Sequence, residues 1–176
     1  MTDAEPLAND PSFGSAAEEL VGRLIAHGWT VAVAESLTGG LVVSSLVSVP
    51  GASVTVRGGV VAYATALKHS LLGVDAALLA AEGAVHPDVA RQMAEGVRES
   101  AAIDGRAADV GIATTGVAGP TPQDARAVGT VHIAVSTPAG TRVETLALVG
   151  SRARIRAGAT AAALALALEC VPPTRL

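Results

Sequence analysis

The chain has 176 residues, half of them hydrophobic, and its 12 basic against 16 acidic residues give a formal net charge of −4. A domain of this length folds without covalent staples, and the single cysteine, Cys170, excludes an internal disulfide framework and a cysteine-based zinc cluster. The acidic balance and only three aromatic residues argue against nucleic acid as a partner, and no apolar run reaches the roughly 18 residues of a membrane span. We therefore expect a cytoplasmic protein that binds neither nucleic acid nor membrane.

The first half of the chain alternates between helical and extended patterns. Residues 1–14 are polar and predict a flexible tail. The elements expected after it, in chain order, are a helix over 15–28, a strand over 29–34, a helix over 41–47, a strand over 54–63, a short helix over 67–72 and a helix capped by Asp75.

The second half adds the clearest helix and a hairpin. The elements expected there are an amphipathic helix over 87–103, a strand over 108–114, a polar loop over 121–127, paired strands over 129–136 and 142–148, a helix over 151–170 and a tail over 172–176. Alternating strands and helices with one hairpin predict an α/β fold, a three-layer αβα sandwich with a mixed, mostly parallel sheet. We expect a single domain over 15–171.

Two loops that combine hydroxyl groups with glycine follow apolar strands. One is Glu35-Ser36-Leu37-Thr38-Gly39-Gly40 and the other is Thr115-Gly116-Val117-Ala118-Gly119-Pro120. Ligands of α/β sheets collect at the carboxyl ends of strands, where free N–H groups at a helix start favour negative charge. Ser36 is therefore either a nucleophile or a simple helix N-cap.

Lysine occurs once in the chain, as Lys68, five residues after the only tyrosine, Tyr63. A lysine whose pKa is depressed by burial can act as the base for a serine nucleophile, and a tyrosine can relay the proton. The alternative is that Lys68 lies in solvent and Tyr63 packs at the end of a strand.

Three arginines open the last helix. Arg152 and Arg156 are four residues apart, on one helical face, with Arg154 between them. Cations are disfavoured at a helix start unless an anion is present, so this pair predicts either a phosphate site or surface ion pairs. The four histidines share no metal-ligand spacing, and we expect no metal site.

Five ordered blocks of the sequence resemble one protein family. They are Val33-Ala34-Glu35-Ser36-Leu37-Thr38-Gly39-Gly40, Gly58 to Tyr63 with Lys68, Glu82-Gly83-Ala84-Val85, Thr115 to Pro120 with Val128-Gly129-Thr130-Val131, and Gly150 to Arg156. Together they are similar to the C-terminal domain of CinA, the family of nicotinamide-nucleotide amidohydrolases. The resemblance covers roughly residues 15–170 and implies a homo-oligomer.

By this resemblance, the protein hydrolyses the carboxamide of nicotinamide mononucleotide to nicotinic acid mononucleotide and ammonia, without a cofactor, in pyridine-nucleotide salvage. The resemblance implies that Ser36 is the nucleophile and that Tyr63 and Lys68 transfer protons. It implies a substrate-binding set of Glu35, Thr38, Gly39, Gly40, Thr115, Gly116, Gly119, Arg152 and Arg156.

The sequence also departs from the family pattern. Leu37 replaces a cysteine, Ser151 replaces an aspartate, and the loop 121–127 lacks the usual glycine run and lysine. These departures keep open an alternative, a non-catalytic nucleotide-binding or regulatory module of the same competence- and damage-associated family.

Overall fold

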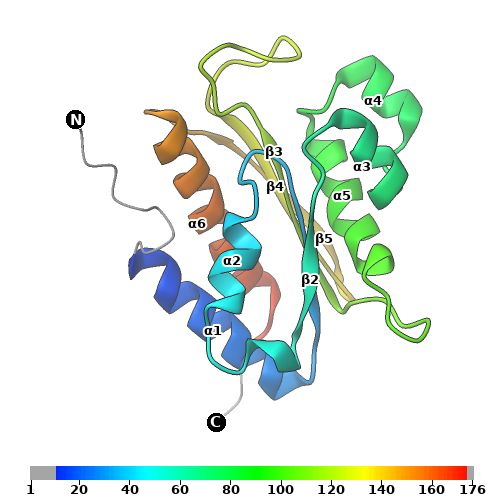
Figure 1. Ribbon diagram of the computed structural model, residues 1–176, viewed down its shortest axis with the longest axis vertical. Coiled ribbons are helices and arrows are strands. Elements are labelled where there is room, and N and C mark those ends of the chain that lie inside the picture. Colours follow the sequence, from blue (N-terminus) through cyan, green and yellow to red (C-terminus); the bar gives the residue numbers. More distant parts are fainter. Residues whose placement is uncertain (1–10, 174–176) are drawn as a thin grey trace.

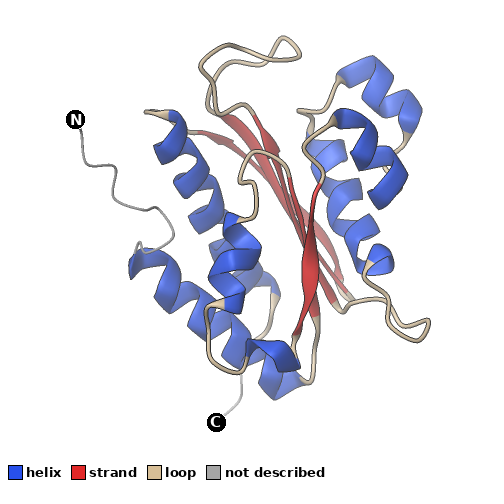
Figure 2. Ribbon diagram, in the orientation of Figure 1, coloured by secondary structure: helices blue, strands red, loops and turns tan. Residues whose placement is uncertain are grey.

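The computed structural model describes residues 11–173 as a central sheet between two groups of helices (Figures 1 and 2). One face is covered by α1 (Pro11–His27), α2 (Leu41–Val47) and α6 (Arg152–Cys170). The other side of the sheet holds α3 (Thr65–Leu72), α4 (Ala76–Glu82) and α5 (Pro87–Ser100), of which α5 packs on the sheet and α3 packs against α5. The predicted three-layer α/β architecture is confirmed. Within 11–173, no helix combines the length and apolarity that crossing a membrane requires.

The sheet has five strands in the order β2-β1-β3-β4-β5. They are β1 (Val31–Glu35), β2 (Val56–Val61), β3 (Val110–Gly116), β4 (Thr130–Thr137) and β5 (Gly140–Ala147). β1 pairs in parallel with β2 and β3, whereas β4 pairs antiparallel with β3 and β5. The sheet is mixed as predicted, with every strand except β4 running in one direction. The carboxyl ends of β1, β2 and β3 therefore lie at the same end of the sheet, which is where the candidate loops begin.

The two faces of the sheet carry side chains of different size. The face toward α1, α2 and α6 bears large residues such as Val33, Ile112 and Ile133, whereas the face toward α5 bears Ala34 and Ala113 in the same strands. Small side chains let α5 lie close to the sheet. At Gly111 a Cβ would lie 2.0 Å from the Ala94 carbonyl oxygen of α5, so the close approach requires glycine. Part of the alanine content therefore serves tight packing of a helix on a sheet.

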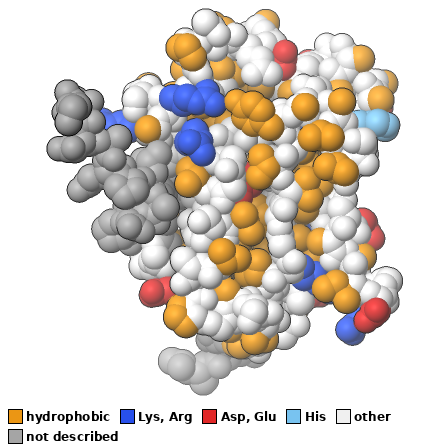
Figure 3. Space-filling view, in the orientation of Figure 1, with side chains coloured by type: hydrophobic (Ala, Val, Ile, Leu, Met, Phe, Trp, Pro, Cys, Tyr) orange, Lys and Arg blue, Asp and Glu red, His pale blue; other side chains and the backbone are white. Residues whose placement is uncertain are grey.

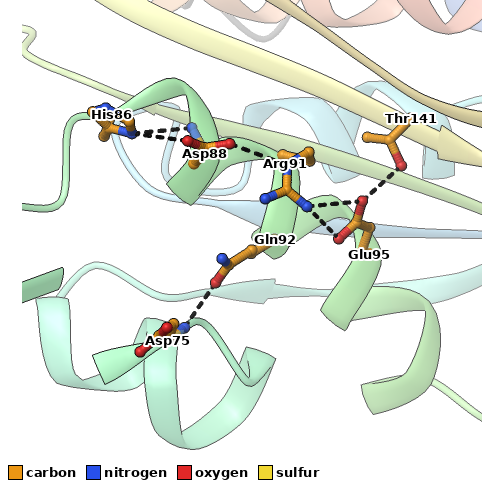
Figure 4. A network of polar contacts seen from close by, with 7 residues as sticks. All are labelled: Asp75, His86, Asp88, Arg91, Gln92, Glu95 and Thr141. Atoms are coloured by element: carbon orange, nitrogen blue, oxygen red, sulfur yellow. Dashed lines mark hydrogen bonds and ion pairs between the residues drawn. The ribbon is translucent and has the colours of Figure 1, made fainter. Parts of the chain in front are cut away.

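Polar contacts fix the position of α5 in addition to its apolar face. Figure 4 shows Arg91 between Asp88 and Glu95 of its own helix, with Glu95 accepting a hydrogen bond from Thr141 of β5 at 3.0 Å. Gln92 accepts a hydrogen bond from the backbone N–H of Asp75 at 2.7 Å, which ties α5 to the start of α4. The side chain of Asp75 caps α4 as predicted, because it accepts from Ala77 N–H at 2.7 Å.

Element boundaries differ from the sequence prediction mainly at two helix ends. α1 begins at Pro11 rather than Ser15, which fits the preference of proline for the first helical turn. α5 ends at Ser100 rather than at residue 103, because Ile103 and Arg106 pair through two backbone hydrogen bonds and turn the chain back toward β3. The remainder of the two predicted tails, residues 1–10 and 174–176, lies outside the described residues.

Candidate functional site

The first candidate loop leaves the buried strand β1 at Ser36 and enters α2 at Leu41. Glu35, the last residue of β1, is 1% exposed, and its carboxylate accepts hydrogen bonds from the N–H groups of Gly40, Val42 and Val43. Glycine at the N-cap position has no side chain with which to satisfy these donors. Glu35, predicted to bind substrate, therefore caps α2 and holds the end of the loop.

Lys68 lies beside Ser36 inside the protein. Its ammonium nitrogen is 3.1 Å from Ser36 Oγ and 2.7 Å from the Ala62 carbonyl oxygen, and the side chain is 1% exposed. α3 presents Lys68 on the same buried face as Leu72, one helical turn later. Burial lowers the pKa of Lys68 to about 8, against a smaller raising effect of Asp124. The structure thus joins a serine to a lysine that loses its proton more easily than usual.

Tyr63 occupies a different place from this buried pair. The residue is 62% exposed, and its hydroxyl accepts a hydrogen bond from Arg152 at 3.1 Å. Arg152 also donates to the Gly119 carbonyl oxygen at 2.7 Å. The chain segments after β2 and β3 are thus linked through the first residue of α6 at the rim of the site.

A cavity of about 320 Å³ lies between these groups. Seven of the sequence-predicted residues line it: Ser36, Tyr63, Lys68, Thr115, Gly116, Gly119 and Arg152. Sequence reasoning missed Leu37, Ala84, Val85 and several residues between 117 and 123, which complete the lining. Leu37, Val117 and Ala118 lie within the two candidate loops, and Ala84 and Val85 lie in a block that resembles the family, but their apolar side chains give no sign of a binding role. Of the described lining residues, Lys68 and Arg152 are the basic ones.

Four further predicted binding residues lie behind the loop and outside the cavity lining. The hydroxyls of Thr38 and Thr114 are hydrogen-bonded at 2.8 Å in the interior. Arg156 reaches from α6 to the carbonyl oxygens of Leu37 and Thr38 at 2.9 and 2.7 Å. Gly39 lies against that guanidinium, and Gly40 starts α2 in the left-handed region. The side chains of Thr38 and Arg156 and the two glycines support the Ser36 loop, and none of these four residues is among those that line the cavity.

The three arginines at the start of α6 differ in how deeply they are buried. Arg152 is exposed at the cavity rim, Arg156 is half-buried behind the loop, and Arg154 is exposed between them. Ser151, one of the departures from the family pattern, caps α6 by accepting a hydrogen bond from Arg154 N–H at 3.3 Å. The i,i+4 spacing places both outer arginines near the Ser36 loop, with Arg152 lining the cavity and Arg156 behind the loop.

The loop after β3 is fastened to the segment between α4 and α5. Thr115 donates its hydroxyl hydrogen to the Ala84 carbonyl oxygen at 2.7 Å, and Asp124 accepts from Ala84 N–H at 2.8 Å. Asp124 is the group whose charge opposes the lowered pKa of Lys68, and it had no sequence signal beyond its place in a polar loop. His132, 5% exposed, is hydrogen-bonded to Thr145 at 2.9 Å within the sheet, and burial lowers its pKa. Across 11–173, no three His, Cys, Asp or Glu side chains gather as metal ligands would.

The sequence has relatives among known proteins. The sequence profile of the CinA C-terminal domain matches residues 14–171. A CinA-like protein of Frankia casuarinae is 49% identical over 158 residues, which cover 88% of this chain and 35% of that protein. A CinA-like protein of Anaeromyxobacter dehalogenans is 51% identical over 161 residues, which cover 88% of this chain and 38% of that protein. The chain thus spans little more than a third of the length of these relatives.

Solved structures share the fold over almost the whole chain. A competence-damaged protein (CinA) superfamily protein from Enterobacter cloacae matches with a TM-score of 0.85 and 28% identity, over 98% of this chain and 99% of that one. The competence/damage inducible protein CihA from Agrobacterium tumefaciens matches with a TM-score of 0.83 and 29% identity, over 96% of this chain and 98% of that one. The profile match, the identities and the shared fold together establish that this chain belongs to the CinA C-terminal domain family.

Proposed function

We propose that the protein hydrolyses the carboxamide of nicotinamide mononucleotide to nicotinic acid mononucleotide and ammonia. The observation that carries the proposal is the buried contact of 3.1 Å between Lys68 Nζ and Ser36 Oγ. An isolated buried lysine is costly, since desolvation disfavours its charged form. Placing such a lysine on a serine hydroxyl at the floor of a cavity is an arrangement suited to nucleophilic catalysis.

In the proposed mechanism, neutral Lys68 takes the proton of the Ser36 hydroxyl as Oγ attacks the carboxamide carbon. The resulting tetrahedral oxyanion is stabilised by backbone N–H groups of the loop that begins at Ser36. Its collapse breaks the C–N bond, and Lys68 returns the proton to the leaving nitrogen, so that ammonia departs. Water then attacks the acyl-enzyme with Lys68 again accepting a proton, which releases the carboxylic acid and restores Ser36.

Tyr63 and Arg152 are assigned to recognition at the rim. The Tyr63 hydroxyl is engaged by Arg152, whereas Lys68 is the basic group within hydrogen-bonding distance of Ser36. We therefore propose Lys68 as the base. The guanidinium of Arg152 presents planar N–H donors suited to a phosphate, and we propose that it binds the 5′-phosphate of the substrate. Its bonds to Gly119 and Tyr63 place this cation beside the cavity.

The test is an ammonia-release assay on nicotinamide mononucleotide, nicotinamide riboside and free nicotinamide, with chromatographic detection of the acid product. The proposal expects stoichiometric ammonia and nicotinic acid mononucleotide, with the phosphorylated amide as the preferred substrate. Saturable binding of the mononucleotide without any ammonia would contradict it and would favour the alternative, a non-catalytic nucleotide-binding or regulatory module.

We further propose that the chain acts in the cytoplasm as a homo-oligomer. β2 is an edge strand, and exposed apolar residues occur in it and in the segments before and after it in the chain: Val54 at 70%, Val61 at 44% and Leu71 at 47%. Figure 3 shows hydrophobic side chains gathered on the face where Figure 1 places β2. A second copy of the chain would remove this area from water. Sedimentation at micromolar concentration should give a mass above that of one chain, and a single-chain mass would contradict the proposal.

A further inference from the structure

The backbone of the Ser36 loop leaves two donors unused. The N–H of Gly39 donates to the Ser36 carbonyl, that of Leu41 to the Thr38 carbonyl, and those of Gly40, Val42 and Val43 to the Glu35 carboxylate. The N–H groups of Leu37 and Thr38 have no acceptor among the described residues. Both residues are buried, Leu37 at 4% and Thr38 at 0% exposure, and buried N–H groups are rarely left unpaired. Two adjacent unpaired donors beside a nucleophile therefore require an explanation.

Arg156 controls the direction of both donors. A peptide unit is planar and trans, so a carbonyl that points to one side sends the N–H of the next residue to the opposite side. Arg156 Nε binds the Leu37 carbonyl at 2.9 Å, and this bond turns the Thr38 N–H away from α6.

The second arm of the guanidinium acts one peptide unit further along. Arg156 Nη2 binds the Thr38 carbonyl at 2.7 Å, which turns the Gly39 N–H toward its 3.2 Å contact with the Ser36 carbonyl. That contact in turn directs the Leu37 N–H away, and Leu37 lines the cavity. One planar fork thus sets the orientation of both free donors, each through one of its two bonds.

The space for this fork is provided by the residue that it touches. A Cβ on Gly39 would lie 3.2 Å from Arg156 Nη2, and Gly39 adopts a left-handed φ of +61°. Glu35 and Arg156 bind different backbone groups of the loop. The carboxylate accepts hydrogen bonds from N–H groups at the end of the loop, and the guanidinium donates hydrogen bonds to carbonyl oxygens at its centre. The groups that remain free are those next to Ser36.

We infer that Arg156 is a positioning residue, which holds the Leu37 and Thr38 N–H groups as an oxyanion hole beside Ser36 and does not bind the substrate phosphate. This inference rests on the proposed amide hydrolysis. It assigns to Arg156 a role different from that of Arg152, although both belong to the same face of α6. A positioning role predicts an effect on the rate of the chemical step, whereas a phosphate ligand would change KM for phosphorylated substrates alone.

The test compares Arg156→Lys with Arg154→Lys, the same change at an exposed position of the same helix. Lysine keeps the charge but lacks the fork that binds two carbonyls at once. We expect Arg156→Lys to lower kcat by about 10- to 100-fold, somewhat less than removal of an oxyanion donor, with KM changed by no more than about twofold. The loss should be equal for nicotinamide mononucleotide and nicotinamide riboside, and Arg154→Lys should behave as the wild type.

A second readout does not depend on the proposed substrate. A fluorophosphonate probe phosphonylates activated serines, and its rate of reaction at Ser36 is followed by peptide mass spectrometry. The labelling rate should fall in Arg156→Lys and stay unchanged in Arg154→Lys. If the wild type is labelled but releases no ammonia from the mononucleotide, the proposed function fails, and the labelling comparison still decides the role of Arg156.

Three results would overturn the inference: a raised KM for the phosphorylated amide alone with unchanged kcat, wild-type labelling of Arg156→Lys, or no labelling of Ser36 in the wild type. If Arg156→Lys does not fold, Arg156→Gln provides the decision, since its neutral amide also lacks the guanidinium fork that binds the Leu37 and Thr38 carbonyl oxygens. That variant should show the same selective loss of labelling and kcat, and wild-type rates in it would contradict the inference.

Discussion

The floor and the rim of the cavity are built differently. On the floor, Ser36 and Lys68 are 8% and 1% exposed and are held by hydrogen bonds to each other and to the backbone. On the rim, Tyr63 is 62% exposed, and the exposed Arg152 is its partner. Groups withdrawn from water have altered proton affinities and fixed positions, whereas exposed groups are free to exchange partners. The difference suggests that bond breaking occurs on the floor and recognition on the rim.

The largest effect should follow from removing the floor nucleophile. Ser36→Ala should lower kcat by at least about 10⁴-fold, as loss of the nucleophile does in serine hydrolases, because no other hydroxyl is bound to Lys68 within residues 11–173. Binding of the mononucleotide, measured by calorimetry, should survive, since the rim is unchanged. Ser44→Ala, an exposed serine of α2, is the matched control. If the Ser36→Ala variant kept the wild-type rate, Ser36 could not be the nucleophile, and the reaction would not take place at the floor of the cavity.

The base on the floor should set the pH dependence. Because the pKa of Lys68 is lowered to about 8 and the neutral amine is the active form, kcat/KM should rise with pH up to about 8 and then level off. Lys68→Met should lower kcat by about 10²- to 10⁴-fold and abolish that rise. A wild-type profile that falls between pH 7 and 9 would show that charged, rather than neutral, Lys68 is required.

The rim cation should act on binding instead. Arg152→Ala should raise KM for nicotinamide mononucleotide by about 10- to 100-fold, the range for a lost hydrogen bond to a charged group, with little change in kcat. The riboside, which lacks the phosphate, should be affected much less, and Arg154→Ala should match the wild type. Steady-state kinetics with both substrates measures this. A drop in kcat with constant KM would place Arg152 in the chemical step and erase the distinction between floor and rim.

The buried Lys68 on the floor should also lower the free energy of unfolding of the protein. Burial lowers the pKa of Lys68 from 10.5 in the unfolded chain to about 8, so the charged form is penalised in the folded state. The penalty is fully present below pH 8 and disappears as the pH rises to 10.5. Lys68→Met should therefore be more stable at pH 7 by about 1–3 kcal/mol, less the lost hydrogen bonds, and no more stable at pH 10.5. Urea unfolding at both pH values measures this, and a less stable variant at pH 7 would contradict it.

The smallest effect is expected at Tyr63. Tyr63→Phe removes the hydroxyl that accepts from Arg152 and leaves the exposed ring, so KM should rise by about two- to fivefold with kcat unchanged. The result separates the two candidates for proton transfer. A fall in kcat of more than about 100-fold would show that Tyr63 takes part in the chemical step and would contradict its assignment to substrate recognition at the rim.

Sequence periodicity predicted the layers and most elements, because burial of one helix face and of whole strands leaves a pattern along the chain. The helix over 41–47 was predicted with the bounds that α2 has, since Gly40 and Pro50 flank it. The end of α5 was missed, because the backbone pairing of Ile103 with Arg106 decides it rather than helix preference. The candidate loops were found from hydroxyls and glycine at the carboxyl ends of strands.

The sequence could not predict which residues of the site line the cavity and which lie buried behind it. Arg152 and Arg156 share one helical face, and only packing decides that one reaches the cavity while the other turns to the backbone behind it. Glu35 resembles a binding residue until its carboxylate is seen to cap a helix that begins with glycine. Asp124 influences Lys68 across 56 positions of the chain, and no local pattern predicts such a contact.

The most direct test of the central claim is to trap the covalent intermediate. Wild-type protein is mixed with nicotinamide mononucleotide, quenched in acid within the first turnovers, and analysed by intact mass and peptide mapping. We expect an adduct equal to the substrate minus ammonia on the peptide that carries Ser36, and none in Ser36→Ala. Ammonia release with no adduct on Ser36, or with an adduct on another residue, would contradict the account.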